Sequence, residues 1–201
     1  IFIAVLASGQ ITMVACGGFT SVGGSLRGSL AAVNVATRQV LDWGPAVSGQ
    51  VFSLSASPTT VYVGGRFTAV GGQLRNNLAA VDIASGAVTA WNPDATEPPY
   101  MSTSVRSVLC SGATVYAAGY FTLIGGEPRN HMAALDPATG AVTPWNPNPA
   151  GVVEELFASD TTLYVGGYFT SIGGQPRSNL AAIGMPSGLV TPWNPGANST
   201  V

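Results

Sequence analysis

The chain has 201 residues and a formal net charge of −2; 26 residues are glycine, only 8% are charged, and every basic residue is arginine. This balance excludes the basic surface that attracts nucleic acids or anionic membranes. No apolar run approaches the length of a membrane-spanning helix, so we expect no nucleic-acid partner and no membrane insertion.

Copies of one motif follow each other along nearly the whole sequence. In each copy a Phe-Thr pair is followed, at nearly constant offsets, by a Gly-Gly pair, an arginine and a tryptophan. The phenylalanines are 48, 54 and 48 residues apart. An internal period near 50 with strand-like content indicates the blades of a propeller or a related array. The four anchors are Phe19, Phe67, Phe121 and Phe169.

Each copy divides into four predicted strands, which are clearest in the second copy. There the strands are predicted at 51–55, 60 to about 69, 77–82 and 87–91. Within the third of these, apolar residues occupy both alternation faces, which is typical of a sheet that is covered on both sides. Neighbouring blades of a propeller provide such cover.

The turns agree with this division. Ser85-Gly86 and its counterparts in the third and fourth copies predict tight turns between the last two strands. The first copy has Thr37-Arg38 instead, so we expect Arg38 either to adopt a left-handed conformation or to widen the turn. Pro144 and Pro192 precede the tryptophans of their copies, which places the fourth predicted strand at the outer edge of each sheet.

These boundaries predict an all-β propeller of four blades, each a four-stranded antiparallel sheet. The second copy ends in an eleven-residue connection, 94–104, where the others have five residues. Val201 occupies the first core position of a fifth copy, and the chain begins without Met. We therefore expect a segment of a longer protein, in which four blades either close alone or form part of a larger ring. The predicted blades are 1–50, 51–104, 105–152 and 153–200.

The string G-G-x-F-T-x-h-G-G-x-x-R-x-x-L-A-A-h, followed by T-G-x-V-T-x-W-N-P, resembles the delta-60 type β-propeller repeat, a domain of unknown function. It is also similar to repeats of fungal cortical-marker surface proteins. The resemblance covers all four copies. It implies a propeller in large secreted or surface-anchored proteins, and it implies no established chemistry. The chain departs from this pattern at four positions. Cys16 and Ala118 replace the first glycine, Gly44 replaces the asparagine of W-N-P, and Gly184 occupies the position that Asp82 and Asp136 hold in their copies.

The recurring arginine and tryptophan each have a functional and a structural interpretation. The arginines could form a repeated anion site, but we favour bonds from their five donors to carbonyls of the glycine-rich loop, or stacking on a tryptophan. The tryptophans could be platforms for sugars, but we favour packing between blades. These residues are Arg27, Arg75, Arg129, Arg177, Trp43, Trp91, Trp145 and Trp193.

Binding is expected where the copies differ, because scaffolds carry function on variable positions and loops. One set precedes the anchor phenylalanine. Another follows the first core residue of each copy, and we expect it to line a central channel. Glu154 is expected to form a solvated ion pair with Arg106. The candidates are Arg66, Tyr120, Tyr168, Phe52, Arg106 and Glu154, with Pro99, Tyr100 and Met101 in the long connection.

Groups suited to catalysis are scarce. His131 is the single histidine, so neither a histidine-dependent triad nor a multi-histidine metal site can form from it. Cys16 and Cys110 occupy small-residue positions and are expected to be free thiols. We therefore expect no cofactor or metal and a non-enzymatic extracellular or cell-surface interaction or structural module, bound by protein partners or further copies of itself. The alternatives are a multivalent glycan-binding propeller and a fragment of a propeller enzyme whose active site lies elsewhere.

Overall fold

The computed structural model describes residues 2–7, 11–97, 103–185 and 187–201, and within these ranges the chain contains β-strands and turns but no helix. Four main sheets follow one another along the chain. Sheet 1 contains β1 (Phe2–Ala7), β2 (Ile11–Cys16) and β5 (Leu30–Asn34). Sheet 2 contains β6 (Val47–Ala56), β7 (Thr60–Val70), β8 (Gln73–Leu74) and β9 (Leu78–Asp82). Sheet 3 contains β11 (Ser104–Ser111), β12 (Thr114–Tyr120) and β15 (Met132–Leu135). Sheet 4 contains β16 (Gly151–Ser159), β17 (Thr162–Phe169) and β20 (Leu180–Gly184).

Every main sheet has the same antiparallel topology, with the second strand of the repeat in the centre. The register between the second and third strands is also the same, because Gly64 pairs with Leu78 in sheet 2 and Gly166 pairs with Leu180 in sheet 4. The first two strands of sheet 1 pair differently: Leu6 lies opposite Thr12, whereas its counterpart Leu54 lies opposite Val63. Short two-residue strands form the hairpins beside these sheets. They are β3 (Ser21–Val22), β4 (Ser25–Leu26), β10 (Ala95–Thr96), β13 (Leu123–Ile124), β14 (Glu127–Pro128), β18 (Ser171–Ile172) and β19 (Gln175–Pro176).

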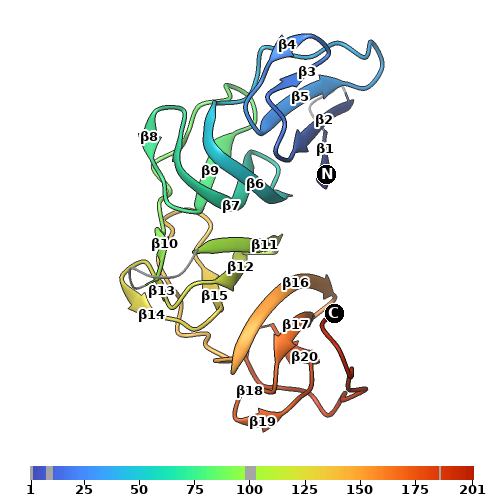
Figure 1. The fold of residues 1–201 in the computed structure, drawn as a ribbon, viewed down its shortest axis with the longest axis vertical. Helices are drawn as coiled ribbons and strands as arrows, with labels where there is room; N and C mark the ends of the chain where they lie inside the picture. Colours follow the sequence, from blue (N-terminus) through green and yellow to red (C-terminus); the bar gives the residue numbers. More distant parts are fainter. Residues whose placement is uncertain (1, 8–10, 98–102, 186) are drawn as a thin grey trace.

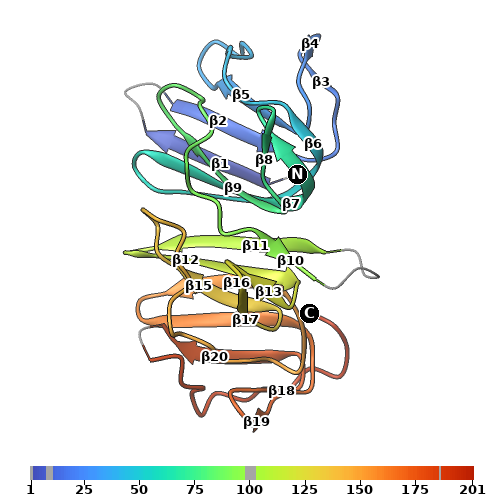
Figure 2. The same cartoon turned by 90° about the vertical axis from the view of Figure 1, so that its left-hand side faces the viewer.

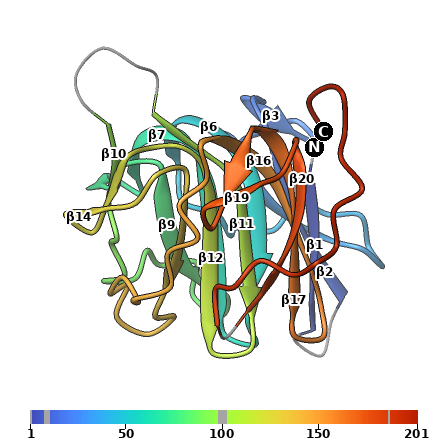
Figure 3. The ribbon, with the colours of Figure 1, turned by 90° about the horizontal axis from the view of Figure 1, so that it is seen from below.

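The main sheets lie one after another along an arc (Figure 1). The first strands of the repeats, β6, β11 and β16 among them, lie toward its inner side, and the small hairpins such as β8 and β14 lie toward its outer side. Seen from the outer side, the sheets form a stack along the long axis (Figure 2). Along that axis they lie one behind another (Figure 3). β1 and the carboxy-terminal residues lie on the inner side of the arc.

The apolar core lies between the sheets rather than within them. We call the side of a sheet that contacts the next sheet its forward face, and the opposite side its backward face. In sheet 2, the forward face carries Tyr62 and Leu78 against sheet 3, and the backward face carries Val61 and Val81 against sheet 1. All four side chains are buried, and each contributes about 1.5–3 kcal/mol to folding. The predicted cover on both faces is thus confirmed for sheet 2.

The prediction of a fourth strand in each copy is wrong, because these residues do not form a continuous strand. Residues 87–91 and their counterparts join the sheets through one isolated bridge each, such as Val81 to Val88. The pairing ends because the carbonyl of Thr89 accepts a hydrogen bond from the side chain of Arg75. In the third and fourth copies the counterpart of Thr89 is followed by a proline, Pro144 or Pro192. Proline has no N–H and therefore cannot continue the ladder of backbone hydrogen bonds.

The tight turns before these segments form as predicted. Gly86, Gly140 and Gly188 have φ angles of 70°, 79° and 69°, a region in which glycine is unstrained. Arg38 has φ 61°, and its N–H bonds to the Asn34 carbonyl at 2.8 Å, so it takes the left-handed conformation without widening the turn. Among the described residues no helix has the length and apolar character to span a membrane.

Candidate interaction surface

The recurring arginine braces its own sheet. In sheet 2, one terminal nitrogen of Arg75 donates to the Leu74 carbonyl at 2.7 Å, and the other donates to the Thr89 carbonyl at 2.7 Å. The other three arginines, Arg27, Arg129 and Arg177, make the same two contacts at 2.8–2.9 Å, with the preceding carbonyl and with the carbonyl fourteen residues later. Their terminal donors therefore bind backbone carbonyls, and the geometry is that of a structural clamp.

The recurring tryptophan joins its own sheet to the next one. The Trp91 indole N–H donates to the Asp136 carbonyl of sheet 3 at 2.9 Å, and the ring packs edge-on against Tyr62 with 5.1 Å between centroids. Trp91 is 3% exposed and Trp145 8%, so neither offers an open face to a sugar. Equivalent N–H donors are those of Trp43, to the Ile83 carbonyl at 2.9 Å, and Trp145, to the Gly184 carbonyl at 3.5 Å.

Several predicted binding residues meet at one edge of the sheets. Arg106 donates from Nε to Glu154 at 2.7 Å, and the Tyr120 hydroxyl donates to the same carboxylate at 2.9 Å. The Arg106 guanidinium also lies over the ring of Phe52, 4.9 Å from its centroid. We call these four residues the rim cluster. It connects sheets 2, 3 and 4, and it includes the predicted ion pair.

The backbone explains why these residues meet. The register pairs Ser104 with Tyr120 and Val152 with Tyr168, so the residue before each anchor phenylalanine lies beside the start of the first strand. The first strands of sheets 2, 3 and 4 then have an irregularity in their pairing, for example between Val105 and Ser107. The extra residue at that point is Phe52, Arg106 or Glu154 in the three sheets, and a bulge of this kind re-aims the side chain of its extra residue.

The rim cluster has a distinct electrostatic character. The hydrogen bond to Glu154, together with partial burial and the nearby negative charge, raises the pKa of Tyr120, while Arg106 acts in the opposite direction. Arg66 and Tyr168 lie at the equivalent register positions of sheets 2 and 4 and are exposed, Tyr168 at 68%. The edge therefore combines aromatic and guanidinium groups with a single shared carboxylate.

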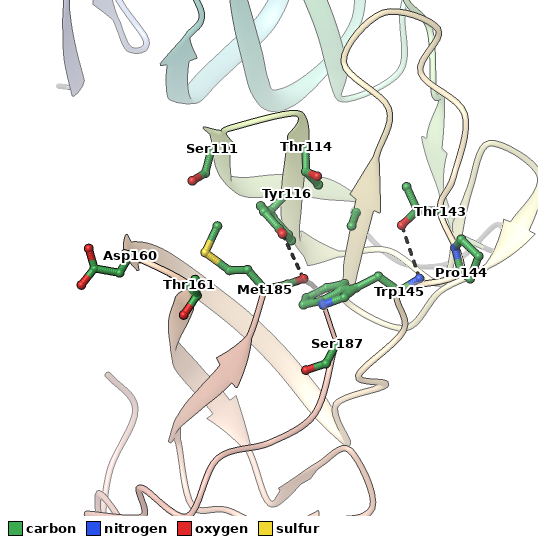
Figure 4. A pocket seen from close by; sticks show the side chains of 11 residues that line it. Ser111, Thr114, Tyr116, Thr143, Pro144, Trp145, Asp160, Thr161, Met185 and Ser187 are labelled. Carbon is green, nitrogen blue, oxygen red and sulfur yellow. Dashed lines mark hydrogen bonds between the residues drawn. The ribbon is translucent and has the colours of Figure 1, made fainter.

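A groove between sheets 3 and 4 was not anticipated from the sequence. Its volume is about 580 Å³, and Tyr116, Trp145, Met185, Thr143 and Asp160 are among its lining residues. Figure 4 shows Tyr116 and Trp145 beside Met185 at the centre of this groove. A second groove of about 420 Å³ lies at the equivalent place between sheets 2 and 3, lined by residues that include Tyr62 and Trp91. The groove is thus a feature of the repeat.

The remaining candidates do not join these sites. Pro99, Tyr100 and Met101 lie outside the described residues. His131 has a positive φ of 58°, and its Nδ1 lies 3.1 Å from the Gly119 carbonyl, which is the environment of a turn residue. Cys16 and Cys110 are free of disulfides. Among the residues that the structure describes, no three His, Cys, Asp or Glu side chains form a group that could hold a metal ion.

Comparisons with known proteins support a propeller repeat. The model of a family described as a domain of unknown function, DUF5122 beta-propeller, matches residues 158–181. This segment contains β17, the β18–β19 hairpin and Arg177. No curated protein matches the chain.

The solved structures that resemble the chain include two computationally designed proteins. One is the designed Ika8 protein, with 12% sequence identity and a TM-score of 0.57, over 99% of this chain and 50% of the other. The other is the designed Ika4 protein, with 12% identity and a TM-score of 0.46, over 76% of each chain. The chain thus spans half the length of the first, and this likeness concerns the fold alone.

Proposed function

We propose that the chain is a non-enzymatic interaction module of a secreted or cell-surface protein, in which each main sheet with its hairpin is one propeller blade. The delta-60 type of the repeat and the location outside the cell rest on the sequence resemblance. The scaffold residues that recur in every copy, such as Arg75 and Trp91, are engaged in backbone contacts. They leave the variable positions free to determine what the module binds.

One observation supports this function most directly: the variable residues gather at one edge. Exposed Tyr168 and Arg66 lie on the same edge as the partly exposed pair Tyr120 and Arg106. Tyrosine and arginine are enriched in the residues that contribute most to protein–protein binding. Because the cluster spans three sheets, its surface suits a folded protein partner better than a small ligand.

Differential capture tests this proposal. Immobilised wild-type chain would be compared with a variant that carries Arg66→Ala, Tyr120→Ala and Tyr168→Ala, using solubilised cell-surface proteins as the input. A matched control carries Leu26→Ala, Leu74→Ala and Leu189→Ala, three exposed apolar residues away from this edge. We expect wild type and control to retain the same proteins and the rim variant to lose them. Equal capture by all three chains would refute the role of this edge.

A second function, glycan binding, is favoured only by the grooves between sheets. Tyr116 and Trp145 line one of these grooves together with Thr143 and Asp160, and aromatic edges with polar groups in the same groove can bind sugars. A glycan array with the wild-type chain and an Asp160→Ala variant tests it. A glycan that binds wild type and not the variant would support this function, and an array without binding would remove it.

A further inference from the structure

The two ends of the stack carry apolar faces that other sheets bury. On the forward face of sheet 4, Trp193 is 43% exposed, whereas Trp91 and Trp145 are 3% and 8% exposed. Leu180 on this face is half-buried, although its counterparts Leu78 and Met132 are fully buried. The residues are of the same kind in each sheet, so the difference in exposure arises because no other sheet among the described residues packs on this face of sheet 4.

The backward face of sheet 1 shows the same loss of cover. Met13 and Val33 are half-buried there. The residues at these positions in the later sheets are all buried. They are Val61, Val115 and Leu163, and Val81, Leu135 and Ile183. Val35 at the following turn is 46% exposed. Sheet 1 therefore presents a face that is built to be covered by a preceding sheet.

The chain itself shows what fits these faces. A forward face packs on a backward face three times within it, in three apolar clusters between successive sheets. Each junction also contains an indole N–H that donates to a carbonyl of the next sheet. The indole N–H of Trp193 has no such acceptor among the described residues, although Tyr164 packs against its ring as in the other pairs.

We propose that a second copy of this chain covers both faces, with the forward face of sheet 4 in each copy packed on the backward face of sheet 1 in the other. The same junction made twice closes the assembly around a two-fold axis. The four-sheet arc matches 50% of the designed chain that it resembles, so two copies together match the length of that chain. β1 and the carboxy-terminal residues also lie on the inner side of the arc (Figure 1), where the two copies face each other.

The polar groups at the new junction have counterparts in the existing ones. At the junction of sheets 2 and 3, the Ser53 hydroxyl accepts the N–H of Val108, and at the next junction the Ser107 hydroxyl accepts the N–H of Leu156. Glu155 occupies this position in sheet 4 and is exposed. Its carboxylate can accept an N–H from β1 of the second copy, which would keep a buried donor satisfied.

One residue makes the junction between copies different from those within a copy. In the internal junctions a turn glycine lies beneath the tryptophan, and a Cβ at Gly86 would lie 3.1 Å from the Trp43 ring. Sheet 1 has Arg38 at this position. Its Cβ requires a shift of a few tenths of an ångström, and its guanidinium can then lie over the Trp193 indole as a cation–π contact.

In this assembly the second copy displaces Val201 from its position against sheet 4. Val201 contacts Gly166 as Val105 contacts Gly64, and its N–H bonds to the Gly167 carbonyl at 3.3 Å. In the proposed assembly the β1 strand of the second copy lies at this place. Val201 is 51% exposed. Its displacement loses one long hydrogen bond to Gly167, and the hydrogen bonds that β1 of the second copy makes would replace it.

Sedimentation equilibrium of the purified chain tests the proposal over a range of concentrations. We expect a mass approaching twice the 20.3 kDa of one chain as the concentration rises, and no further growth. A chain that ends at Ala197 should associate more tightly, since it has no segment to displace. A single-copy mass at all concentrations, a mass that grows beyond two copies, or weaker association of the shortened chain would overturn the proposal.

A charge exchange identifies the contact. Trp193→Arg removes the indole and faces Arg38 with a like charge, so it should weaken association about tenfold or more. Adding Arg38→Glu to that variant should restore most of the affinity, since residues 193 and 38 then carry opposite charges across the junction. Leu74→Arg on the outer hairpin, where Leu74 is 78% exposed, is the matched control and should leave the mass unchanged. Equal association of all variants would place the contact elsewhere.

Discussion

Sheets 2 and 4 contain the same pair of aromatic residues in two different environments. Tyr62 and Trp91 lie 5.1 Å apart in an edge-on arrangement, and Tyr164 and Trp193 lie 5.4 Å apart in the same arrangement. Only the first pair is covered, and only its indole N–H bonds to the following sheet. The pair thus forms within its own sheet, while its burial depends on the neighbour.

This difference indicates how the stability of the chain is divided between the single sheets and the interfaces between them. In repeat architectures it is approximately the sum of the stability of each unit and of its interfaces with adjacent units. Substitutions at contacts within a sheet should therefore cost the same in any sheet, whereas substitutions at contacts between sheets should cost more in the interior. The predictions below separate the two kinds of contact.

The largest effect is expected from a contact between sheets. Trp91→Ala should lower the free energy of unfolding by about 4 kcal/mol, because it empties a buried site and removes a donor from the Asp136 carbonyl. Trp193→Ala should lower it by less than about 1 kcal/mol, as for an exposed side chain. Urea unfolding followed by circular dichroism, at concentrations that keep the chains separate, measures both. Equal losses would contradict the division into internal and terminal junctions.

The arginine clamp should show the opposite behaviour. Arg75 and Arg177 each bind the preceding carbonyl, a glutamine side chain and a threonine carbonyl at 2.7–2.9 Å. Arg75→Ala and Arg177→Ala should therefore each cost about 2 kcal/mol, because carbonyls lose charged donors. The measurement is the same urea titration.

A lysine substitution is the control for this clamp. Arg177→Lys keeps the charge and loses the planar fork that binds two carbonyls at once, so it should recover little of the lost stability. Full recovery with lysine, or a loss in sheet 2 that is absent in sheet 4, would show that charge or the neighbouring sheet matters more than the clamp.

Much of the fold could be predicted from the sequence because the repeat encodes it locally. The alternating apolar positions of 77–82 predict cover on both faces, and Leu78 and Val81 are indeed buried between different pairs of sheets. The left-handed conformation at Arg38 is one of the two alternatives that the sequence leaves open, since the three other copies have glycine there. Both features depend on residues within one copy.

Two features could not be predicted. One depends on a side chain that competes with the backbone for a carbonyl, and the other depends on one extra residue in a strand. The fourth strand failed because the Arg75 side chain, fourteen residues away in sequence, takes the Thr89 carbonyl from the ladder. The bulge that turns Arg106 toward Glu154 has no marker in the sequence, since it is defined only by the pairing of two strands. The ion pair between Arg106 and Glu154 could be predicted from the sequence, but the contacts of Phe52 and Tyr120 with this pair required the structure.

A smaller effect is expected within the rim cluster. Glu154→Gln should lower the pKa of Tyr120, because it removes a charged acceptor and a nearby negative charge, two of the causes that raise it. Since the folded-state pKa lies above the usual value of about 10, this interaction stabilises the fold below that value and is lost as the pH rises through the folded-state pKa. Ultraviolet titration of tyrosinate, with Tyr120→Phe to assign the signal, measures the shift. An unchanged pKa would exclude the Tyr120–Glu154 contact.

The smallest effect concerns the tight turns, where the two inner sheets again differ from the two terminal ones. Asp82 accepts hydrogen bonds from the Ser85 side chain and backbone, and Asp136 does so from Thr139, and these bonds lower the pKa of both carboxyls. Sheets 1 and 4 have Asn34 and Gly184 at this position.

Because the folded-state pKa values are lowered, the two carboxylates contribute stability above the usual aspartate value of about 3.9, and this contribution is lost as the pH falls through the folded-state values. A chain with Asp82→Asn and Asp136→Asn should therefore melt slightly below wild type at pH 7, and its melting temperature should depend less on pH below about 4. Calorimetry across this range compares the two chains. Asn34→Ala is the control: its side-chain oxygen accepts the Thr37 N–H at 2.9 Å, so its loss should shift the curve by the same amount at every pH. Parallel curves for the double variant and wild type would mean that the turn carboxylates of the inner sheets act as neutral acceptors do.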